Sequence, residues 1–333
     1  MSPSRTPLGP GAEFDLIRTL MGSDEPLPPG VEVGPGDDAL VLEGGWVISV
    51  DLTVEGIHYR REWVDLEEAG YRATAAALSD LAAMAASPVG VLLSLGLSKE
   101  EIREQAAKLQ RGASRACRRE GVAVLGGDVT ATPGPCVIDV VAMGRTSSPV
   151  GRGGSRPGDE VWVTGRLGAS AGAVLLWERG EEPPQELREA FVRPVPRIRE
   201  ARWLAERVFL RALIDLSDGL AGDAGHLAAA GRVGIVLLEE TVPLHGAVSE
   251  IVPGPEQALG LALTGGEDYE ICFTVGPGGL DEHADDFRRT FGLSLTRVGR
   301  VEVGQGVVLE DPAGRRRPLP SGGFSHVQLK EDG

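Results

Sequence analysis

The chain has 333 residues, which is enough for two domains that each bury a hydrophobic core. Its 33 basic residues (Lys and Arg) stand against 49 acidic ones (Asp and Glu), giving a formal net charge of −16. This balance disfavours binding to duplex nucleic acid, which requires a basic face to displace counterions, so we expect no nucleic-acid partner. Small phosphorylated ligands remain possible, provided that metal ions neutralise both the ligand and the protein's carboxylates.

Cysteine usage and the N-terminus indicate the compartment. The three cysteines are far apart and have no CxxC spacing, so they predict buried thiols in a reducing compartment rather than disulfides or a zinc site. Residues 1–12 are rich in Pro, Gly and Ser and lack an apolar signal core, which predicts a disordered lead-in. The uncharged run 81–98 is broken by Pro88 and Gly90, so a helix followed by a buried strand is favoured over a membrane span. We expect a cytoplasmic protein without membrane contact.

The first half of the chain alternates strands and helices. The patterns predict a helix over 13–21, strands over 39–42 and 46–52, a long helix over 66–86, a buried strand over 89–97, an amphipathic helix over 99–120, and strands over 122–125 and 136–143. Residues 148–159 are rich in Gly, Ser, Pro and Arg, which is typical of a linker. We therefore expect an N-terminal domain over 13–147.

The second half repeats this alternation. It predicts strands over 160–164, 212–216, 235–238, 269–275, 296–303 and 307–309, and helices from 169 and over 185–192, 196–208, 221–230 and 281–291. The order of elements indicates an α/β protein with a second α/β domain over 160–333.

Five short acidic clusters are spread along the chain beside small residues, mostly where a strand or helix is expected to end. They are Gly36-Asp37-Asp38, Ser49-Val50-Asp51, Leu78-Ser79-Asp80, Gly126-Gly127-Asp128 and Asp215-Leu216-Ser217-Asp218-Gly219. Hard oxygen ligands of this kind suit Mg²⁺ that bridges protein and phosphate. An assembled metal–nucleotide site is therefore favoured over scattered surface charge.

Each cluster taken alone also has a plain structural explanation. Asp218 could be a helix N-cap, and Gly126-Gly127-Asp128 a polar turn at the end of a strand. Asp80, expected in the middle of a long helix among Ala and Leu, is harder to explain without a partner or a metal. Arg193 and Arg197 are helix-end charges or phosphate contacts, and residues 165–172 are a weak phosphate-loop signal.

The usual lysine-based ATP sites are missing. No lysine follows a glycine as a P-loop requires, and neither a kinase HRD loop nor a strict GxGxxG occurs. If the protein handles ATP, metal ions must therefore carry more of the charge.

Taken together, these segments resemble the thiamine-monophosphate kinase family of the aminoimidazole-ribonucleotide-synthetase-like ATP-binding superfamily. The segments that carry the resemblance occur in the family's order between residues 13 and 324 and are GDDAL (36–40), SVDLTVEGIHY (49–59), LSDLAAMAASP (78–88), LGGDVT (125–130), GRGGSRPGD (151–159), VTGRLGASAG (163–172), RPVPR (193–197), IDLSDGL (214–220) and GGEDYE (265–270). Any one is weak, but the ordered set is specific.

The resemblance implies a fold, a reaction and a set of site residues. The N-terminal mixed-sheet domain would form the interface of a homodimer, and the active site would lie between the two domains. The reaction would transfer the γ-phosphoryl group of ATP to thiamine monophosphate with several Mg²⁺ ions. By motif match, the metal ligands would be Asp38, Ser49, Asp51, Asp80, Asp128, Asp215 and Asp218; the ATP contacts Gly127, Asp128, Arg152 and Ser217; and the substrate contacts His58, Glu267 and Phe324.

No covalent or general-base residue is expected. A phosphate monoester, with a second pKa near ~6, is mostly dianionic at neutral pH and can attack directly. We therefore expect in-line transfer without a phosphoenzyme. One departure from the family pattern concerns the metal site, because Val50 replaces a hydroxyl residue between Ser49 and Asp51.

Two alternatives remain open. One is a sister enzyme of the same superfamily, such as an ATP-dependent synthetase acting on a purine precursor. Selenophosphate synthetases are disfavoured, because they use a reactive Cys or selenocysteine near the N-terminus and the first cysteine here is Cys117. The other alternative is a non-catalytic nucleotide-binding protein.

Overall fold

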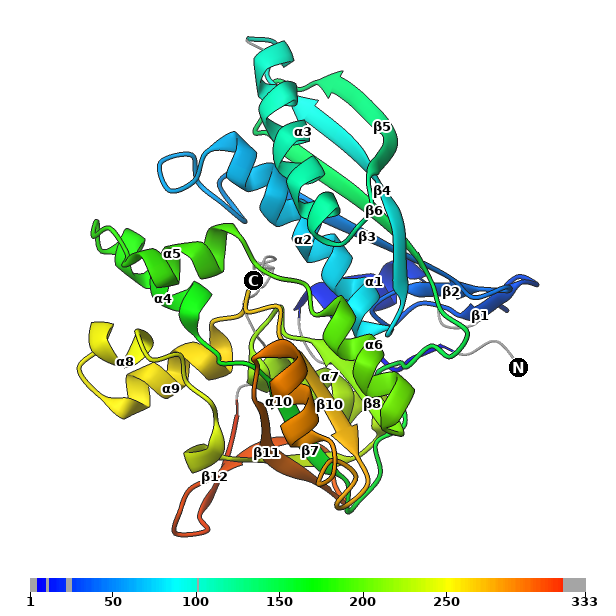
Figure 1. Ribbon diagram of the computed structural model, residues 1–333, viewed down its shortest axis with the longest axis vertical. Coiled ribbons are helices and arrows are strands. Elements are labelled where there is room, and N and C mark those ends of the chain that lie inside the picture. Colours follow the sequence, from blue (N-terminus) through cyan, green and yellow to red (C-terminus); the bar gives the residue numbers. More distant parts are fainter. Residues whose placement is uncertain (1–4, 10–11, 22–25, 101, 320–333) are drawn as a thin grey trace, which may run out of the picture.

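The computed structural model describes residues 5–9, 12–21, 26–100 and 102–319. Within these ranges the strands form two sheets, one from each half of the sequence (Figure 1). None of the described helices is long and apolar enough to cross a membrane. Phe324, a predicted substrate contact, lies outside the described residues.

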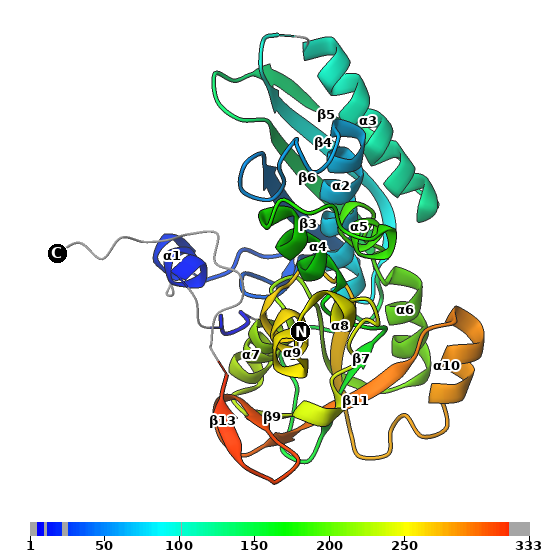
Figure 2. The same cartoon turned by 90° about the vertical axis from the view of Figure 1, so that its left-hand side faces the viewer.

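The first sheet is mixed and has six strands in the order β1-β2-β3-β6-β4-β5. All neighbouring pairs are antiparallel except β4 and β5, which are parallel. Helices α2 and α3 pack against β3, β4 and β6, as the two views show (Figure 2). The elements of this half are α1 (Ala12–Met21), β1 (Val31–Val33), β2 (Leu40–Leu42), β3 (Trp46–Val54), α2 (Leu66–Ala83), β4 (Ser87–Leu97), α3 (Ile102–Arg119), β5 (Val124–Ala131) and β6 (Val137–Arg145).

Helix α2 is the central element of the molecule. It starts at a capping box, in which the Asp65 carboxylate accepts from the Glu68 backbone N–H at 2.8 Å and the Glu68 side chain accepts from the Asp65 N–H at 3.1 Å. Its alanine-rich surface is buried nearly all round, because it contacts α3, the first sheet, β8, α5 and α6. Such a helix holds both halves of the chain in one arrangement.

Glycines allow α2 and α3 to approach closely. A Cβ at Gly112 would clash with the Glu67 carbonyl, and one at Gly70 with the Leu109 carbonyl. We expect Gly112→Ala to lower the free energy of unfolding by about 2 kcal/mol, measured by urea denaturation. The matched control is Gly260→Ala in another helix, where nothing lies within 4 Å of the added Cβ. There the substitution should raise stability by about 0.5–1 kcal/mol, and equal losses at both sites would contradict the close packing of α2 and α3.

The second sheet has seven strands in the order β13-β12-β9-β11-β7-β10-β8. Its pairs are antiparallel except β9 and β12. The elements of this half are β7 (Glu160–Thr164), α4 (Ala169–Glu178), α5 (Gln185–Val192), α6 (Ile198–Arg207), β8 (Leu210–Asp215), α7 (Leu220–Gly231), β9 (Gly234–Leu238), the 3₁₀ helix η1 (Glu239–Thr241), α8 (Val248–Ile251), α9 (Pro255–Thr264), β10 (Ile271–Val275), α10 (Ala284–Phe291), β11 (Leu295–Glu302), β12 (Gly306–Glu310) and β13 (Arg316–Pro318).

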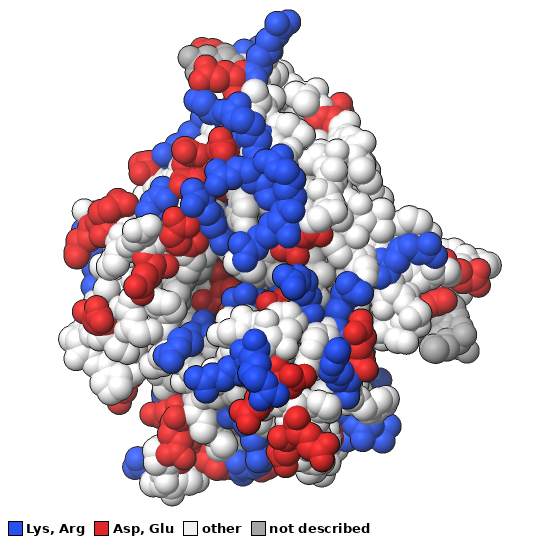
Figure 3. Space-filling model, in the orientation of Figure 1, with Lys and Arg blue, Asp and Glu red and all other residues white. Residues whose placement is uncertain are grey.

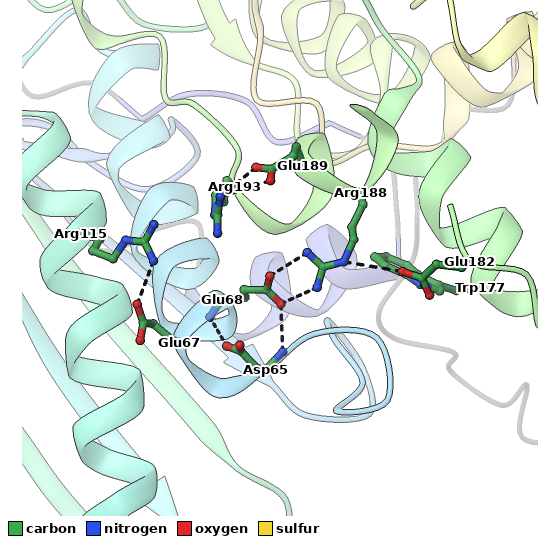
Figure 4. A network of polar contacts seen from close by, with 9 residues as sticks. All are labelled: Asp65, Glu67, Glu68, Arg115, Trp177, Glu182, Arg188, Glu189 and Arg193. Carbon is green, nitrogen blue, oxygen red and sulfur yellow. Dashed lines mark hydrogen bonds and ion pairs between the residues drawn. The ribbon is translucent and has the colours of Figure 1, made fainter. Parts of the chain in front are cut away.

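Ion pairs join the two halves where α5 lies against α2. The Arg188 guanidinium donates to both Glu68 carboxylate oxygens at 2.7 and 2.8 Å (Figure 4). One turn along α2, the buried Arg72 donates to the Phe191 carbonyl at 2.8 Å and pairs with Glu267. These contacts fix the surface on which the candidate site is built.

The structure corrects several expected boundaries. Helix α2 ends at Ala83, because Ala85 takes a left-handed φ of 50° and β4 begins at Ser87, so Asp80 lies in the last turn rather than mid-helix. Strand β5 does not end before Gly126 but continues through Gly126-Gly127-Asp128 as an exposed edge strand. Strands β1 and β13 and helices α8 and α9 were not expected.

Part of the expected N-terminal lead-in has defined contacts. The Thr6 hydroxyl donates to Asp37 at 2.7 Å, and its backbone N–H donates to the Pro35 carbonyl at 3.2 Å. Thr6 is therefore attached to the segment between β1 and β2. Residues 1–4, 10 and 11 lie outside the described ranges.

Candidate active site

Three carboxylates from distant parts of the chain meet between the two sheets. Asp38 precedes β2, Asp80 lies in the last turn of α2, and Asp215 ends β8. One oxygen of each lies within 4.8 Å of the others. A set of oxygen donors at this spacing fits a hard divalent cation such as Mg²⁺.

These carboxylates raise one another's pKa. Burial raises the pKa of Asp215 to about 7, and the charge of Asp38 adds to this, while Arg152 lowers it. Burial, then Asp215, Asp51 and Asp38, raises the pKa of Asp80 well above its ordinary value. Without a cation, the three carboxylates therefore either repel one another as charged groups or keep some of their protons. A divalent ion would relieve that repulsion.

Strand β3 adds two further oxygen donors. The buried Ser49 hydroxyl donates to the Asp80 carboxylate, and Asp51 follows two residues later on the same face. Val50 lies between them on the opposite face, with 65% of its surface exposed. The Val50 side chain therefore does not face the Asp80 carboxylate, so the missing hydroxyl leaves this face of the strand unchanged.

Arg152 neutralises part of the carboxylate group. Its guanidinium donates to both Asp38 oxygens, at 2.7 Å from Nη2 and 3.1 Å from Nε. Its backbone N–H donates to Asp37 at 3.1 Å. Burial opposes the charged form, but Asp38 outweighs it, so the pKa of Arg152 is raised. Arg152 is thus a permanent cation beside the predicted metal ligands, aimed at Asp38 in this structure.

A second group lies at the start of α7. Oxygen and nitrogen atoms of Asp218, Asp223 and His226 lie within 4.8 Å of one another. Asp223 accepts from the Asp218 backbone N–H at 3.1 Å, and His226 Nε2 lies 3.7 Å from Asp218. Sequence reasoning picked Asp218 but missed Asp223 and His226, although their spacing of three residues on a helix places them on one face.

The segment from Gly266 to Tyr269 carries backbone strain. Glu267 and Tyr269 have positive φ angles of 64° and 50°, which are unusual for residues with side chains. The Glu267 N–H donates to the Ser217 carbonyl at 2.8 Å. A predicted substrate contact therefore lies beside a predicted ATP contact. A strained backbone persists only where surrounding contacts hold it in place, and such conformations are concentrated at functional sites.

Glu267 is held by two partners that sequence reasoning missed. Arg72 pairs with its carboxylate from α2, and the Tyr269 hydroxyl donates to it at 2.7 Å. The Arg72 guanidinium also stacks 3.8 Å from the centroid of the Phe191 ring. A single arginine on the buried alanine-rich surface of α2 is the signal that could have found Arg72. His58, in the turn after β3, accepts from the Val54 N–H through Nδ1 at 3.0 Å.

Gly127 and Asp128 do not join the carboxylate group within one chain. The register across the first sheet runs Asp51–Val140–Leu93–Gly127. Three strand spacings therefore separate β3 from β5, which is about 14 Å. Asp128 also projects from the sheet face opposite to Asp51, because neighbouring residues alternate. One cation cannot bind both in a single chain.

The weak phosphate-loop signal over 165–172 has another explanation. The Asp268 carboxylate accepts from the Gly168 N–H at 2.9 Å and from the amides of Ala169 and Ser170 at the start of α4. Burial raises the pKa of Asp268 to about 8. Since a carboxylate of the chain itself takes these amides, they do not bind a phosphate. Arg197 likewise pairs with Glu270.

Comparisons with known proteins decide the family. Family models described as AIR synthase related protein, N-terminal domain and C-terminal domain, match residues 36–146 and 156–311. The thiamine-monophosphate kinase of Rhodopirellula baltica is 33% identical over 301 residues, covering 87% of this chain and 89% of that relative. The chain belongs to the thiamine-monophosphate kinase family. The predicted family and the mixed α/β fold class are thus confirmed.

Solved structures of the thiamine-monophosphate kinase family share the whole fold. AaThiL complexed with AMPPCP and TMP superposes with a TM-score of 0.77 at 31% identity, over 94% of this chain and 96% of that one. The enzyme from Stenotrophomonas maltophilia K279a gives a TM-score of 0.74 at 32% identity, over 91% and 96%. The arrangement of the two sheets is therefore the fold of the family.

Proposed function

We propose that this chain transfers the γ-phosphoryl group of ATP to thiamine monophosphate, forming thiamine diphosphate and ADP. The observation that carries the proposal is the meeting of Asp38, Asp80 and Asp215 from both halves of a chain that belongs to this kinase family. The AMPPCP and TMP bound by AaThiL support ATP and thiamine monophosphate as the substrate pair.

We assign roles to the predicted residues as follows. Several Mg²⁺ ions bind through Asp38, Ser49, Asp51, Asp80, Asp128, Asp215 and Asp218, and ATP contacts Gly127, Asp128, Arg152 and Ser217. His58, Glu267 and Phe324 line the thiamine phosphate pocket. Bound Mg²⁺ supplies charge neutralisation between the two anionic substrates.

The residues of the chain orient the reactants rather than move protons. Arg72 and Tyr269 hold the Glu267 carboxylate toward the substrate pocket, and Arg152 adds a fixed cation beside the metal ligands. The acceptor phosphate is already dianionic at neutral pH, so no general base is required. Transfer in one in-line step predicts inversion at a chiral γ-phosphorus, and retention would exclude it.

The direct test is an assay for thiamine diphosphate after incubation with Mg-ATP and thiamine monophosphate. Formation of the product supports the kinase. ATP binding without product favours a non-catalytic nucleotide-binding protein, and ATP hydrolysis only with a purine precursor favours the sister synthetase. Asp218→Asn should abolish turnover while keeping the fold.

We also infer a homodimer whose active sites are shared between subunits. The sheet face that α2 and α3 leave uncovered exposes apolar side chains, including Val50 and Leu52 with 65% and 51% of their surfaces exposed. Exposed apolar surface of this kind marks interfaces. Within one chain, Gly127 and Asp128 do not reach the carboxylate group. In a dimer, β5 of the second copy would supply them.

A mixing experiment tests this shared site. Asp80→Asn and Asp128→Asn should each be inactive, because each removes one proposed metal ligand. After unfolding and refolding together, heterodimers would contain one intact site, so about a quarter of the wild-type activity should return. If Asp128 acted within its own chain, both sites of the heterodimer would be damaged and no activity would return.

The remaining organisation follows the two sheets. We propose an N-terminal domain over 13–147, a linker over 148–159 and a C-terminal domain from 160. The strands of the first sheet lie between Val31 and Arg145 and those of the second between Glu160 and Pro318, which supports these limits. The three cysteines are buried free thiols, which supports a cytoplasmic location.

A further inference from the structure

Arginine side chains surround a hollow between α3 and α5 (Figure 3). The hollow has a volume of about 830 Å³. We call it the arginine cleft and define it by Arg115, Arg118, Arg119 and Arg193, with Tyr71 as a further lining residue. None of these residues belongs to the carboxylate group or to the proposed substrate contacts.

The charge of the cleft is opposite to that of the chain. Four guanidinium groups line it against the two carboxylates of Glu186 and Glu189, in a protein of net charge −16. Arg118 makes no side-chain hydrogen bond or ion pair within the described part of the chain. Arginines therefore outnumber carboxylates in the lining itself, whereas Glu67 and Glu120, just outside it, pair with Arg115 and Arg119. Arg118 is the lining arginine without such a partner among the described residues.

The other three arginines have carboxylate partners, and one of these pairs is exposed on both sides. Arg193 pairs with Glu189 at 3.2 Å, and both side chains are 40% exposed. Exposed pairs of this kind contribute about 0–1 kcal/mol, so Arg193 can turn toward an anion at little cost. Arg119 lies 3.7 Å from Glu120, whose side chain is only 5% exposed, so Arg119 stays beside that carboxylate. Arg115 stays beside Glu67 at 2.9 Å (Figure 4).

The arginines come from two walls. Arg115, Arg118 and Arg119 lie three and four residues apart on α3, so they project from one face of that helix. Arg193 follows α5 on the opposite wall. A guanidinium group can bind two oxygens of one phosphate, so Arg118 on one wall and Arg193 on the other can each bind one phosphate group. We propose that the arginine cleft binds the diphosphate group of a small phosphorylated molecule without a metal ion.

The position of the cleft gives binding a mechanical consequence. One wall, α3, belongs to the half of the chain with the first sheet, and the other, α5, to the half with the second sheet. A bound diphosphate therefore links the two halves. Tyr71 precedes Arg72, and Arg193 lies two residues after Phe191, whose carbonyl accepts from Arg72. Occupation of the cleft therefore stiffens the contact that holds Glu267. This last link rests on the proposed function, whereas the binding itself does not.

The test is calorimetric titration of the full chain with inorganic pyrophosphate in EDTA. Chelation removes the cations through which the carboxylate group would bind phosphate, so the result does not depend on kinase activity. We expect one pyrophosphate per chain and a rise in melting temperature. Arg118→Gln and Arg193→Gln should each weaken binding by about tenfold or more. A parallel titration with ADP distinguishes a nucleotide from free pyrophosphate as the source of the diphosphate group.

Arg103→Gln is the matched control, because it removes the same charge from the same helix outside the cleft and should change affinity less than about twofold. Circular dichroism verifies that the variants fold. No pyrophosphate binding to the wild-type chain in EDTA would overturn the proposal. Unchanged binding in both cleft variants, or an equal loss in Arg103→Gln, would also overturn it.

Discussion

Asp80→Asn is expected to slow phosphorylation of thiamine monophosphate by about a hundred- to a thousandfold while stabilising the metal-free protein. Asp80 lies within 4.8 Å of Asp38 and Asp215, so its removal takes away a proposed metal ligand and one repelling charge together. The thiamine diphosphate assay measures the first effect, and thermal denaturation in EDTA measures the second. Asp285→Asn, at an exposed position in α10, should change neither.

The pH dependence of stability checks the same group. The pKa of Asp215 is raised to about 7, chiefly by burial and then by Asp38, from about 4 in an unfolded chain. At this group the folded state therefore binds more protons, so its contribution to stability is greatest at acid pH and is lost as pH rises from about 4 to beyond 7. Mg²⁺ should restore most of the melting temperature at pH 8 and little at pH 5. A melting temperature independent of both pH and Mg²⁺ would contradict the metal assignment.

Arg72→Met is expected to lower the free energy of unfolding by about 3 kcal/mol and to raise KM for thiamine monophosphate. The substitution leaves Glu267 without its cation and the Phe191 carbonyl without its 2.8 Å donor. It also removes the stacking of the guanidinium on the Phe191 ring. Urea denaturation and steady-state kinetics measure the two effects.

Arg188→Gln provides the comparison for Arg72, because it breaks another ion pair between α2 and the second half of the chain. The Arg188 side chain is 29% exposed, against 4% for Arg72, so solvent screens its pair with Glu68. We expect a loss of about 1 kcal/mol or less and an unchanged KM. Equal losses in the two variants would show that Glu267 is not positioned by Arg72.

Local patterns predicted the elements with strong local signals. β7, α4 and α5 begin where their patterns indicated, because their boundaries depend on Gly, Pro and turn residues next to them. The end of β5 was misplaced, because glycines in an exposed edge strand look like a turn. α9 went unpredicted, although Pro255 stands at its first position.

The candidate site was predictable only in part. Asp38, Asp80 and Asp215 could be chosen because carboxylates beside small residues recur in the family's order. The lone charge of Arg72 on α2 was a local signal, but its partner could not be predicted, because Glu267 is 195 residues away and only the packing of α2 against the second half brings them together. Asp223 and His226 were missed since a helix pattern alone does not show which face meets Asp218.

The sequence by itself determined the chemical type of the site: oxygen donors in a set order, an acidic net charge and no lysine for a P-loop. The tertiary structure alone decided which donors meet. It brings Asp38, Asp80 and Asp215 together and leaves Asp128 three strands away from Asp51. Local patterns specify strands and helices, but distances between remote segments depend on how α2 packs against both sheets and on the register of the strands.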